Sequence, residues 1–268
     1  MHKSSNQQTG GNPIARQWFT VAAVIASTTV NILSIPYPPE GKNIGEVSDT
    51  TFGNVLITPA GYAFPFIWSL IYVGLIAFAI YQLLPGQRDN RPVAKTAWGV
   101  VGASILQMLW VYAFLTAHFW LSVILMVGIF TCLLFAYLQT RSVKSTRKVR
   151  WLLQAPISIY FSWITVAAVV NIASVLMINL PTYWSTMAVG PMTLAILLLA
   201  ICAAIAAGVA LRHQNAAYPA VTVWALSAIA FRHTDTPLLL ATSLALSLAL
   251  TVIIVRILTR RKGRIQTV

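Results

Sequence analysis

Residues 119–140 have the sequence FWLSVILMVGIFTCLLFAYLQT and contain no charged side chain. A helix needs about 20 residues to cross the roughly 30 Å hydrocarbon core of a bilayer, and this stretch is long enough. Inside lipid the segment must be helical, because each unpaired backbone amide there costs several kcal/mol. The segment therefore predicts a transmembrane helix.

Similar apolar runs recur along the whole chain. Hydrophobic residues make up 58% of the 268 residues and charged residues only 9%, whereas about a quarter of a soluble protein is charged. All five acidic residues lie between the runs. We therefore predict an all-α, polytopic integral membrane helical bundle with about eight transmembrane helices. The predicted spans are 17–35, 61–84, 95–117, 119–140, 151–179, 186–211, 217–232 and 237–258.

Basic residues lie almost entirely on one side of these spans. All Lys and Arg residues except Lys42 and Arg232 belong to the two termini or to one set of alternate loops. The positive-inside rule then predicts that both termini are cytoplasmic, and we expect a bacterial inner (plasma) membrane. The net charge is +13. We expect the basic residues to interact with membrane lipids and not with nucleic acid, because the sequence predicts no soluble basic domain.

The segments outside the spans are short, apart from one loop. Residues 1–16 are polar and predict a disordered cytoplasmic N-terminus, and residues 259–268 predict a basic cytoplasmic tail. The longest exterior loop, residues 36–59, carries three of the five acids. A loop of this length is often a lid or a binding element, and an unstructured connector is the alternative.

Two of the later predicted helices carry small residues at a spacing of four, which places them on one helix face. The functional interpretation is a homodimer face, and the favoured alternative is close packing within the bundle. The residues are Ala200, Ala204 and Gly208 in one helix and Ala241, Ala245 and Ala249 in the other.

Ionisable side chains are missing from the centre of every predicted span. Proton relays, ion-coupled pumps and voltage sensors place such groups at membrane depth, so the sequence argues against those classes. The four histidines lie at span ends or in the tail without metal-ligand spacing. Cys132 and Cys202 lie within predicted spans and are interpreted as small packing residues. We predict that the chain is not an enzyme and requires no cofactor.

Aromatic and amide side chains are the remaining candidates for function. The chain has nine tryptophans, and those at span ends are typical of the headgroup interface. Trp68, Trp110, Trp163 and Trp224 lie deeper, where an indole N–H needs a hydrogen-bond partner.

Three motifs in these deeper segments carry a resemblance to a known family. Residues 59–72, PAGYAFPFIWSLIY, place Tyr72 four residues after Trp68. Residues 163–171, WITVAAVVN, place Ala167 four and Asn171 eight residues after Trp163. Gln107 and Trp110 form a Gln-x-x-Trp pair between these two segments. In this order the motifs resemble the TspO/MBR family, the tryptophan-rich sensory proteins related to the translocator protein.

The resemblance implies a five-helix transmembrane domain over residues 17–180, followed by three additional transmembrane helices over residues 181–258. It implies a membrane receptor or transporter whose pocket binds a hydrophobic ligand, such as a tetrapyrrole (porphyrin or heme) or a sterol, beneath the first loop. The pocket residues that it implies are Trp68, Tyr72, Trp110, Trp163, Ala167 and Asn171.

Depth in the bilayer supports a pocket independently. With the N-terminus inside, Trp68, Gln107, Asn171 and also Asn31 fall in the exterior half of the membrane, and a rise of 1.5 Å per residue places Asn171 about 12 Å outward of Trp163. Indoles and amides at one depth suit a flat, mostly apolar ligand with a few polar atoms. The alternative is that these side chains hydrogen-bond one another between helices.

The chain departs from the family pattern at several positions. Ile57 stands where the family has a tryptophan, and Ala60 replaces the second proline of a pair, which argues against the porphyrin photochemistry proposed for the family. Residues 172–180 lack the Tyr and the Lys or Arg of its cholesterol-recognition pattern. Two other functions stay open: a small-solute transporter with 4+4 helix pseudo-symmetry, indicated by the similar sequences at 30–34 and 170–174, and a membrane scaffold without a ligand.

Overall fold

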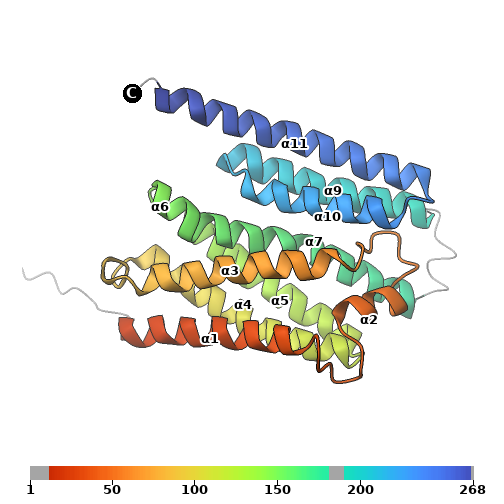
Figure 1. Cartoon of the computed structure of the whole chain (residues 1–268), viewed down its shortest axis with the longest axis horizontal. Coiled ribbons are helices and arrows are strands. Elements are labelled where there is room, and N and C mark those ends of the chain that lie inside the picture. Colours follow the sequence, from red (N-terminus) through yellow and green to blue (C-terminus); the bar gives the residue numbers. More distant parts are fainter. Residues whose placement is uncertain (1–11, 181–189, 267–268) are drawn as a thin grey trace, which may run out of the picture.

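The computed structural model describes residues 12–180 and 190–266, and these residues form an all-α bundle (Figure 1). Its main helices are α1 (Pro13–Leu33), α3 (Ala63–Leu83), α4 (Arg91–Leu115), α5 (Phe119–Arg141), α7 (Ala155–Asn179), α9 (Pro191–His213), α10 (Ala217–Arg232) and α11 (Pro237–Gln266). Shorter elements are α2 (Ile44–Thr51), the single turns η1 (Pro85–Gln87) and α6 (Arg147–Val149), and the π-helical turn η2 (Arg150–Gln154), which leads into α7.

Every predicted span coincides with a main helix, except that positions 186–189 lie outside the described residues, and all ends but that of the last helix agree to within a few residues. Six helices of the described chain are long and apolar enough to cross a membrane: α3, α4, α5, the helix from Arg147 to Asn179, α9, and α11 up to Arg260. The protein is therefore an integral membrane protein with a polytopic helical bundle. The other two predicted spans, α1 and α10, are helices of 21 and 16 residues.

Two helix ends differ from the predicted boundaries. The N-terminal segment 1–16 was expected to be disordered, but α1 already begins at Pro13, because the Asn12 side chain accepts a hydrogen bond from the Ile14 amide at 3.0 Å and proline suits the first helical turn. The rest of that segment lies outside the described residues. The last helix continues from the predicted end at 258 to Gln266.

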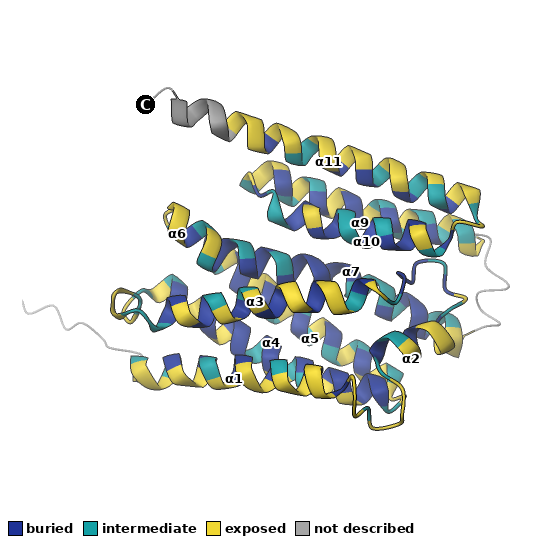
Figure 2. Ribbon diagram, in the orientation of Figure 1, coloured by how far each residue is buried: buried dark blue, intermediate teal, exposed yellow. Residues whose placement is uncertain are grey.

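Helix α7 occupies the centre of the bundle. It packs against α3 and α5 on one side and against α9 and α10 on the other. Helix α1 lies against α3 and α4, and α11 is the outermost helix, in contact with α9 and α10 (Figures 1 and 2). The long helices run back and forth, so that α1 begins and α11 ends at the same end of the bundle (left in Figure 1). Helix α2 and the turn between α10 and α11 lie at the opposite end.

Polar side chains join the three C-terminal helices to the first five. Between α7 and α10, the Ser162 hydroxyl donates to the Tyr218 carbonyl at 2.7 Å, and the Tyr218 hydroxyl donates to Thr165 Oγ1 at 2.7 Å. The Asn215 amide donates to Ser158 Oγ at 2.8 Å. These groups are buried, where an unmade hydrogen bond would be expensive, so the contacts fix α10 in one register on α7. The C-terminal helices are therefore part of the same bundle.

The small-residue faces of α9 and α11 do not pack within the bundle. Ala204, Gly208 and all three alanines of the α11 series are exposed, and a Cβ built on Gly208 would meet no atom within 4 Å. The packing interpretation of these two series is therefore wrong. Helix α9 instead buries a neighbouring face that includes Leu199 and Ala206. A homodimer through the exposed faces stays a prediction.

Close backbone approach occurs instead between α4 and α5. A Cβ built on Gly99 would lie 2.9 Å from both the Ala136 Cβ and the Cys132 carbonyl oxygen. Both cysteines are free. The Cys132 sulfur lies against Gly102 of α4, where an added Cβ would be 3.0 Å away, in agreement with a packing role.

Candidate functional site

A cavity of about 50 Å³ lies among α3, α4, α5 and α7, beneath α2 and the chain that follows it. Its walls are aromatic and aliphatic with a few polar groups. The lining residues are Ile44, Ser48, Phe52, Thr58, Pro59, Phe64, Trp68, Trp110, Phe114, Met126, Trp163, Val166, Ala167, Val170, Asn171 and Ser174.

Five of the eight predicted site residues line this cavity, namely Trp68, Trp110, Trp163, Ala167 and Asn171. They come from three helices far apart in sequence. Helical periodicity explains the α7 members, because Trp163, Ala167 and Asn171 recur every four residues and so share one face. The structure thus brings the three sequence motifs together around one space.

The other three predicted residues are buried but do not line the cavity. Tyr72 stacks on Trp68, with ring centroids 5.6 Å apart. Gln107 and Asn31 are buried in α4 and α1. Tyr72 therefore supports a cavity wall from behind, while Gln107 and Asn31 belong to the surrounding core.

A column of aromatic rings closes one side of the cavity. Trp110 stacks on Phe114 with centroids 4.9 Å apart and planes 19° apart, and Phe114 stacks in turn on Phe52 at 5.8 Å and 22°. Phe119 meets the edge of Phe52 at 5.0 Å. Phe52 follows α2 directly, so the column couples the first loop to the wall of the cavity.

Two fully buried polar atoms of cavity-lining residues have no hydrogen-bond partner among the described residues: Trp110 Nε1 and Ser174 Oγ. Behind the wall, the Tyr72 hydroxyl, both amide atoms of Gln107 and Asn31 Nδ2 are likewise unpartnered within the described part of the chain. A buried polar group without a partner costs about 1–3 kcal/mol. Such groups around an apolar cavity suit a ligand that brings a small number of hydrogen-bonding atoms.

Asn171 differs from these groups because it already has a partner. Its Nδ2 lies 3.2 Å from Ser122 Oγ of α5, and that hydroxyl lies 3.4 Å from Asn171 Oδ1. Bonding between helices, the alternative considered for the amides, therefore applies to Asn171. Trp224 is satisfied in a similar way, since its Nε1 donates to the Ala63 carbonyl of α3 at 3.4 Å.

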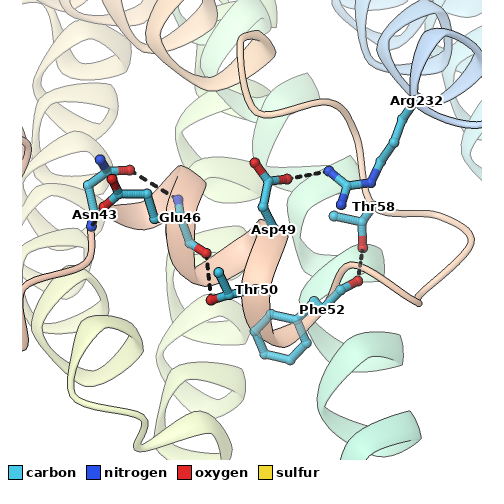
Figure 3. Close-up of polar contacts among 7 residues, drawn as sticks. All are labelled: Asn43, Glu46, Asp49, Thr50, Phe52, Thr58 and Arg232. Carbon is cyan, nitrogen blue, oxygen red and sulfur yellow. Dashed lines mark hydrogen bonds and ion pairs between the residues drawn. The ribbon is translucent and has the colours of Figure 1, made fainter.

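The loop over the cavity is an ordered lid, which we define as residues 36–59. Asn43 and Glu46 cap α2 reciprocally, with the Glu46 amide donating to Asn43 Oδ1 at 3.1 Å and the Asn43 amide donating to Glu46 Oε2 at 2.8 Å. After α2, the Thr58 hydroxyl donates to the Phe52 carbonyl at 3.1 Å (Figure 3). The lid buries Ile44 and Phe52 against the bundle, so the alternative of an unstructured connector is wrong.

The end of α10 holds this lid in place through an ion pair between the guanidinium of Arg232 and Asp49 of α2, which we call the latch (Figure 3). The Ala60 amide donates to the Ala228 carbonyl at 3.2 Å. His233 is buried beside the Thr58 backbone. The lid therefore depends on the C-terminal helices as well as on the helices beneath it.

Burial lowers the pKa of His233, and the neighbouring positive charge of Arg232 lowers this pKa further. Asp235 and a hydrogen bond with the Thr58 backbone act in the opposite direction. The folded protein therefore favours neutral His233 at the junction between the lid and α10.

The sequence motifs missed the lid residues and several wall residues. Phe114 could have been found, because it lies one turn after Trp110 on the same face, and so could Ser174, which lies three residues after Asn171. Phe52 and Ile44 carry no such signal. Their positions follow from how the lid folds back onto the bundle, which helical periodicity in the spans does not report.

A family model described as "TSPO-like protein" matches residues 17–256. The match includes both the five helices that carry the motifs and the three helices that follow them. No curated protein and no solved structure matches the chain.

Proposed function

The chain belongs to the family of TSPO-like proteins, and from that premise we propose that it is a membrane receptor or transporter for a hydrophobic ligand of the tetrapyrrole class. The ligand binds among α3, α4, α5 and α7, beneath the lid. The protein itself requires no cofactor, and a porphyrin or heme is its ligand.

One observation carries this proposal: an apolar, aromatic cavity is lined by residues whose Trp110 Nε1 and Ser174 Oγ have no partner among the described residues. Aromatic faces favour a flat conjugated ring. The unpartnered donors match polar atoms at the edge of such a ring, for example a carboxylate or a ring nitrogen.

Ligand entry requires the lid to move. A cavity of about 50 Å³ is well below the roughly 300–1,000 Å³ of pockets that bind drug-sized molecules. If Phe52 and α2 moved away, the space that they now occupy would be added to the cavity and enlarge it. The described conformation is thus the closed state, and an open state admits the ligand.

Porphyrin titration tests the proposal. Purified parent protein should quench its tryptophan fluorescence on addition of protoporphyrin or heme, and Trp110→Phe should bind less tightly because it lacks the indole donor. Loss of one hydrogen bond of about 1–3 kcal/mol corresponds to roughly 5- to 150-fold in affinity.

Trp224→Phe is the matched control. It also removes one indole, but this indole is outside the cavity and bonded to α3. If the parent shows no saturable quenching, or if both variants lose affinity equally, the pocket assignment is wrong.

A further inference from the structure

A second, larger cavity lies at the end of the bundle away from the lid. Its volume is about 1270 Å³. It opens to the outside and is bordered by the end of α5, the turn that follows it, η2, the end of α9 and α11 at Arg260. The lining residues are Arg141, Ser142, Val143, Lys144, Ser145, Arg150, Gln154, His213, Gln214 and Arg260. We call this space the basic cavity.

The basic cavity has a strong excess of positive charge. Arg141, Lys144, Arg150 and Arg260 line it, and no carboxylate does among the residues that the structure describes. Among the described residues, none of these four cations lies within ion-pair distance of an Asp or Glu, and the ion pair that is formed, between Arg232 and Asp49, is at the lid end. Four like charges around one space repel each other, and an anion within it would relieve that repulsion.

Arg141 is held rigidly at the wall of this cavity. Its Nε donates to Thr140 Oγ1 at 3.2 Å, and its guanidinium carbon lies 4.9 Å from the centre of the Tyr137 ring. Its Nη2 is buried and has no hydrogen-bond partner among the described residues, while other atoms of the side chain line the cavity. A guanidinium held by such contacts at a cavity wall is a group that proteins use to bind phosphate oxygens.

Polar contacts also fix the turn that carries Lys144. The Gln154 amide donates to the Thr140 carbonyl at 3.2 Å, and Ser145 Oγ donates to Gln154 Oε1 at 3.1 Å. On the opposite wall, the Asn215 amide ties the α9–α10 connection to the Tyr137 hydroxyl at 3.4 Å. The basic cavity is therefore built between the first five helices and the C-terminal three, and it needs both.

The position of the cavity points to the lipid headgroup region. Trp151 follows Arg150 directly and is 66% exposed, as is typical of tryptophan at the headgroup level. This end of the bundle is also the end that the distribution of basic residues predicts to be cytoplasmic, where anionic lipids gather around basic pockets between helices.

We propose that the basic cavity binds the phosphate group of an anionic membrane phospholipid. Arg141 and Arg150 contact the phosphate oxygens from the α5–α7 side, and Arg260 closes the site from α11. This site is independent of the hydrophobic pocket beneath the lid, and bound lipid would join the C-terminal helices to the rest of the bundle.

The test measures the thermal stability of the full chain in neutral detergent with added phosphatidylglycerol, phosphatidylcholine or inorganic phosphate. The parent should be stabilised by phosphatidylglycerol more than by phosphatidylcholine. Lys144→Gln with Arg150→Gln should lose most of this difference, with phosphatidylglycerol affinity falling about tenfold or more, because each basic group near a lipid surface contributes about 1 kcal/mol.

Arg91→Gln with Lys95→Gln is the matched control. It also removes two charges at the same end of the bundle, from exposed positions outside the cavity, and it should respond like the parent. Arg260→Gln, at an exposed position near the end of α11, probes the cavity without altering the turn. It too should weaken the response to phosphatidylglycerol, and it provides the test if the double variant fails to fold.

Three results would overturn the proposal. One is an equal response of the parent to the two lipids, and another is an equal loss in the cavity and control variants, which would indicate diffuse surface charge. In the third, millimolar inorganic phosphate displaces phosphatidylglycerol and stabilises the protein as much as the lipid does. That result would indicate that the site binds a soluble phosphate compound.

Discussion

Asn171 and Ser174 are less than one helical turn apart on α7, and both line the hydrophobic cavity, yet their hydrogen bonding differs. Asn171 bonds Ser122, whereas Ser174 Oγ is unpartnered among the described residues. Asn171→Leu should therefore lower stability by about 0.6 kcal/mol, the average for a polar contact between membrane helices. Ser174→Ala should leave stability unchanged or raise it slightly. Melting temperatures in one detergent would compare the two, and equal losses would show that the partners are assigned wrongly.

We expect His233 to make the lid junction sensitive to pH. Because burial and Arg232 lower the pKa of this histidine in the folded state, the stability that its neutral form provides is fully present above the ordinary value of about 6.5 and is lost as the pH falls below it. We expect the melting temperature of the parent to decline between pH 7.5 and pH 5. The decline should be smaller in His233→Gln, and an identical pH profile in the two proteins would contradict this role.

Helix α2 and its latch should control how often the lid opens. The ion pair between Asp49 and Arg232 is partly exposed, so removing it should change global stability by less than about 1 kcal/mol. The same energy can raise the open population up to about fivefold. Hydrogen exchange of lid amides 44–58 should therefore be faster in Asp49→Asn and in Arg232→Gln.

A charge reversal provides the rescue for this prediction. Asp49→Arg combined with Arg232→Asp should restore slow exchange, since the pair is re-formed with its ends exchanged. Glu40→Gln, which removes an exposed acid from the same lid, should exchange like the parent. Faster exchange in Glu40→Gln would attribute the effect to lid charge in general and not to the latch.

Two glycines provide a matched comparison of helix packing. At Gly99 of α4 a methyl group would lie 2.9 Å from atoms of α5, and at Gly208 of α9 it would meet nothing within 4 Å. Gly99→Ala should therefore destabilise the bundle by about 1–3 kcal/mol, the usual effect of overpacking. Gly208→Ala should be neutral or stabilising. Thermal melting of the two variants tests this, and a sensitive Gly208 would indicate that the outer face of α9 is covered by a second copy.

The membrane topology of the whole molecule depends on α10. This helix has 16 residues, about 24 Å at 1.5 Å per residue, which is shorter than the hydrocarbon core. If it nevertheless spans, reporter fusions after Gln214 and at Val268 should both report the cytoplasm, and a fusion after Lys42 should report the exterior. Opposite signals at Gln214 and Val268 would leave seven spans.

The sequence alone determined the helices and five of the residues that line the hydrophobic cavity. Lipid requires apolar helices of a set length, so the spans could be read from uncharged runs such as 119–140, and periodicity placed Trp163, Ala167 and Asn171 on one face. Those local rules hold whichever helices are neighbours.

Only the tertiary structure decided what each face contacts. It turned Ala204 and Ala245 outward, paired Asn171 with Ser122, folded Phe52 over the cavity and linked Asp49 to Arg232. It also gathered Arg141, Arg150 and Arg260 around one space. In a membrane, lipid and protein are equally apolar surroundings for a side chain, so hydrophobicity does not distinguish the lipid-facing side of a helix from its packed side. That choice is made by how the helices fit together.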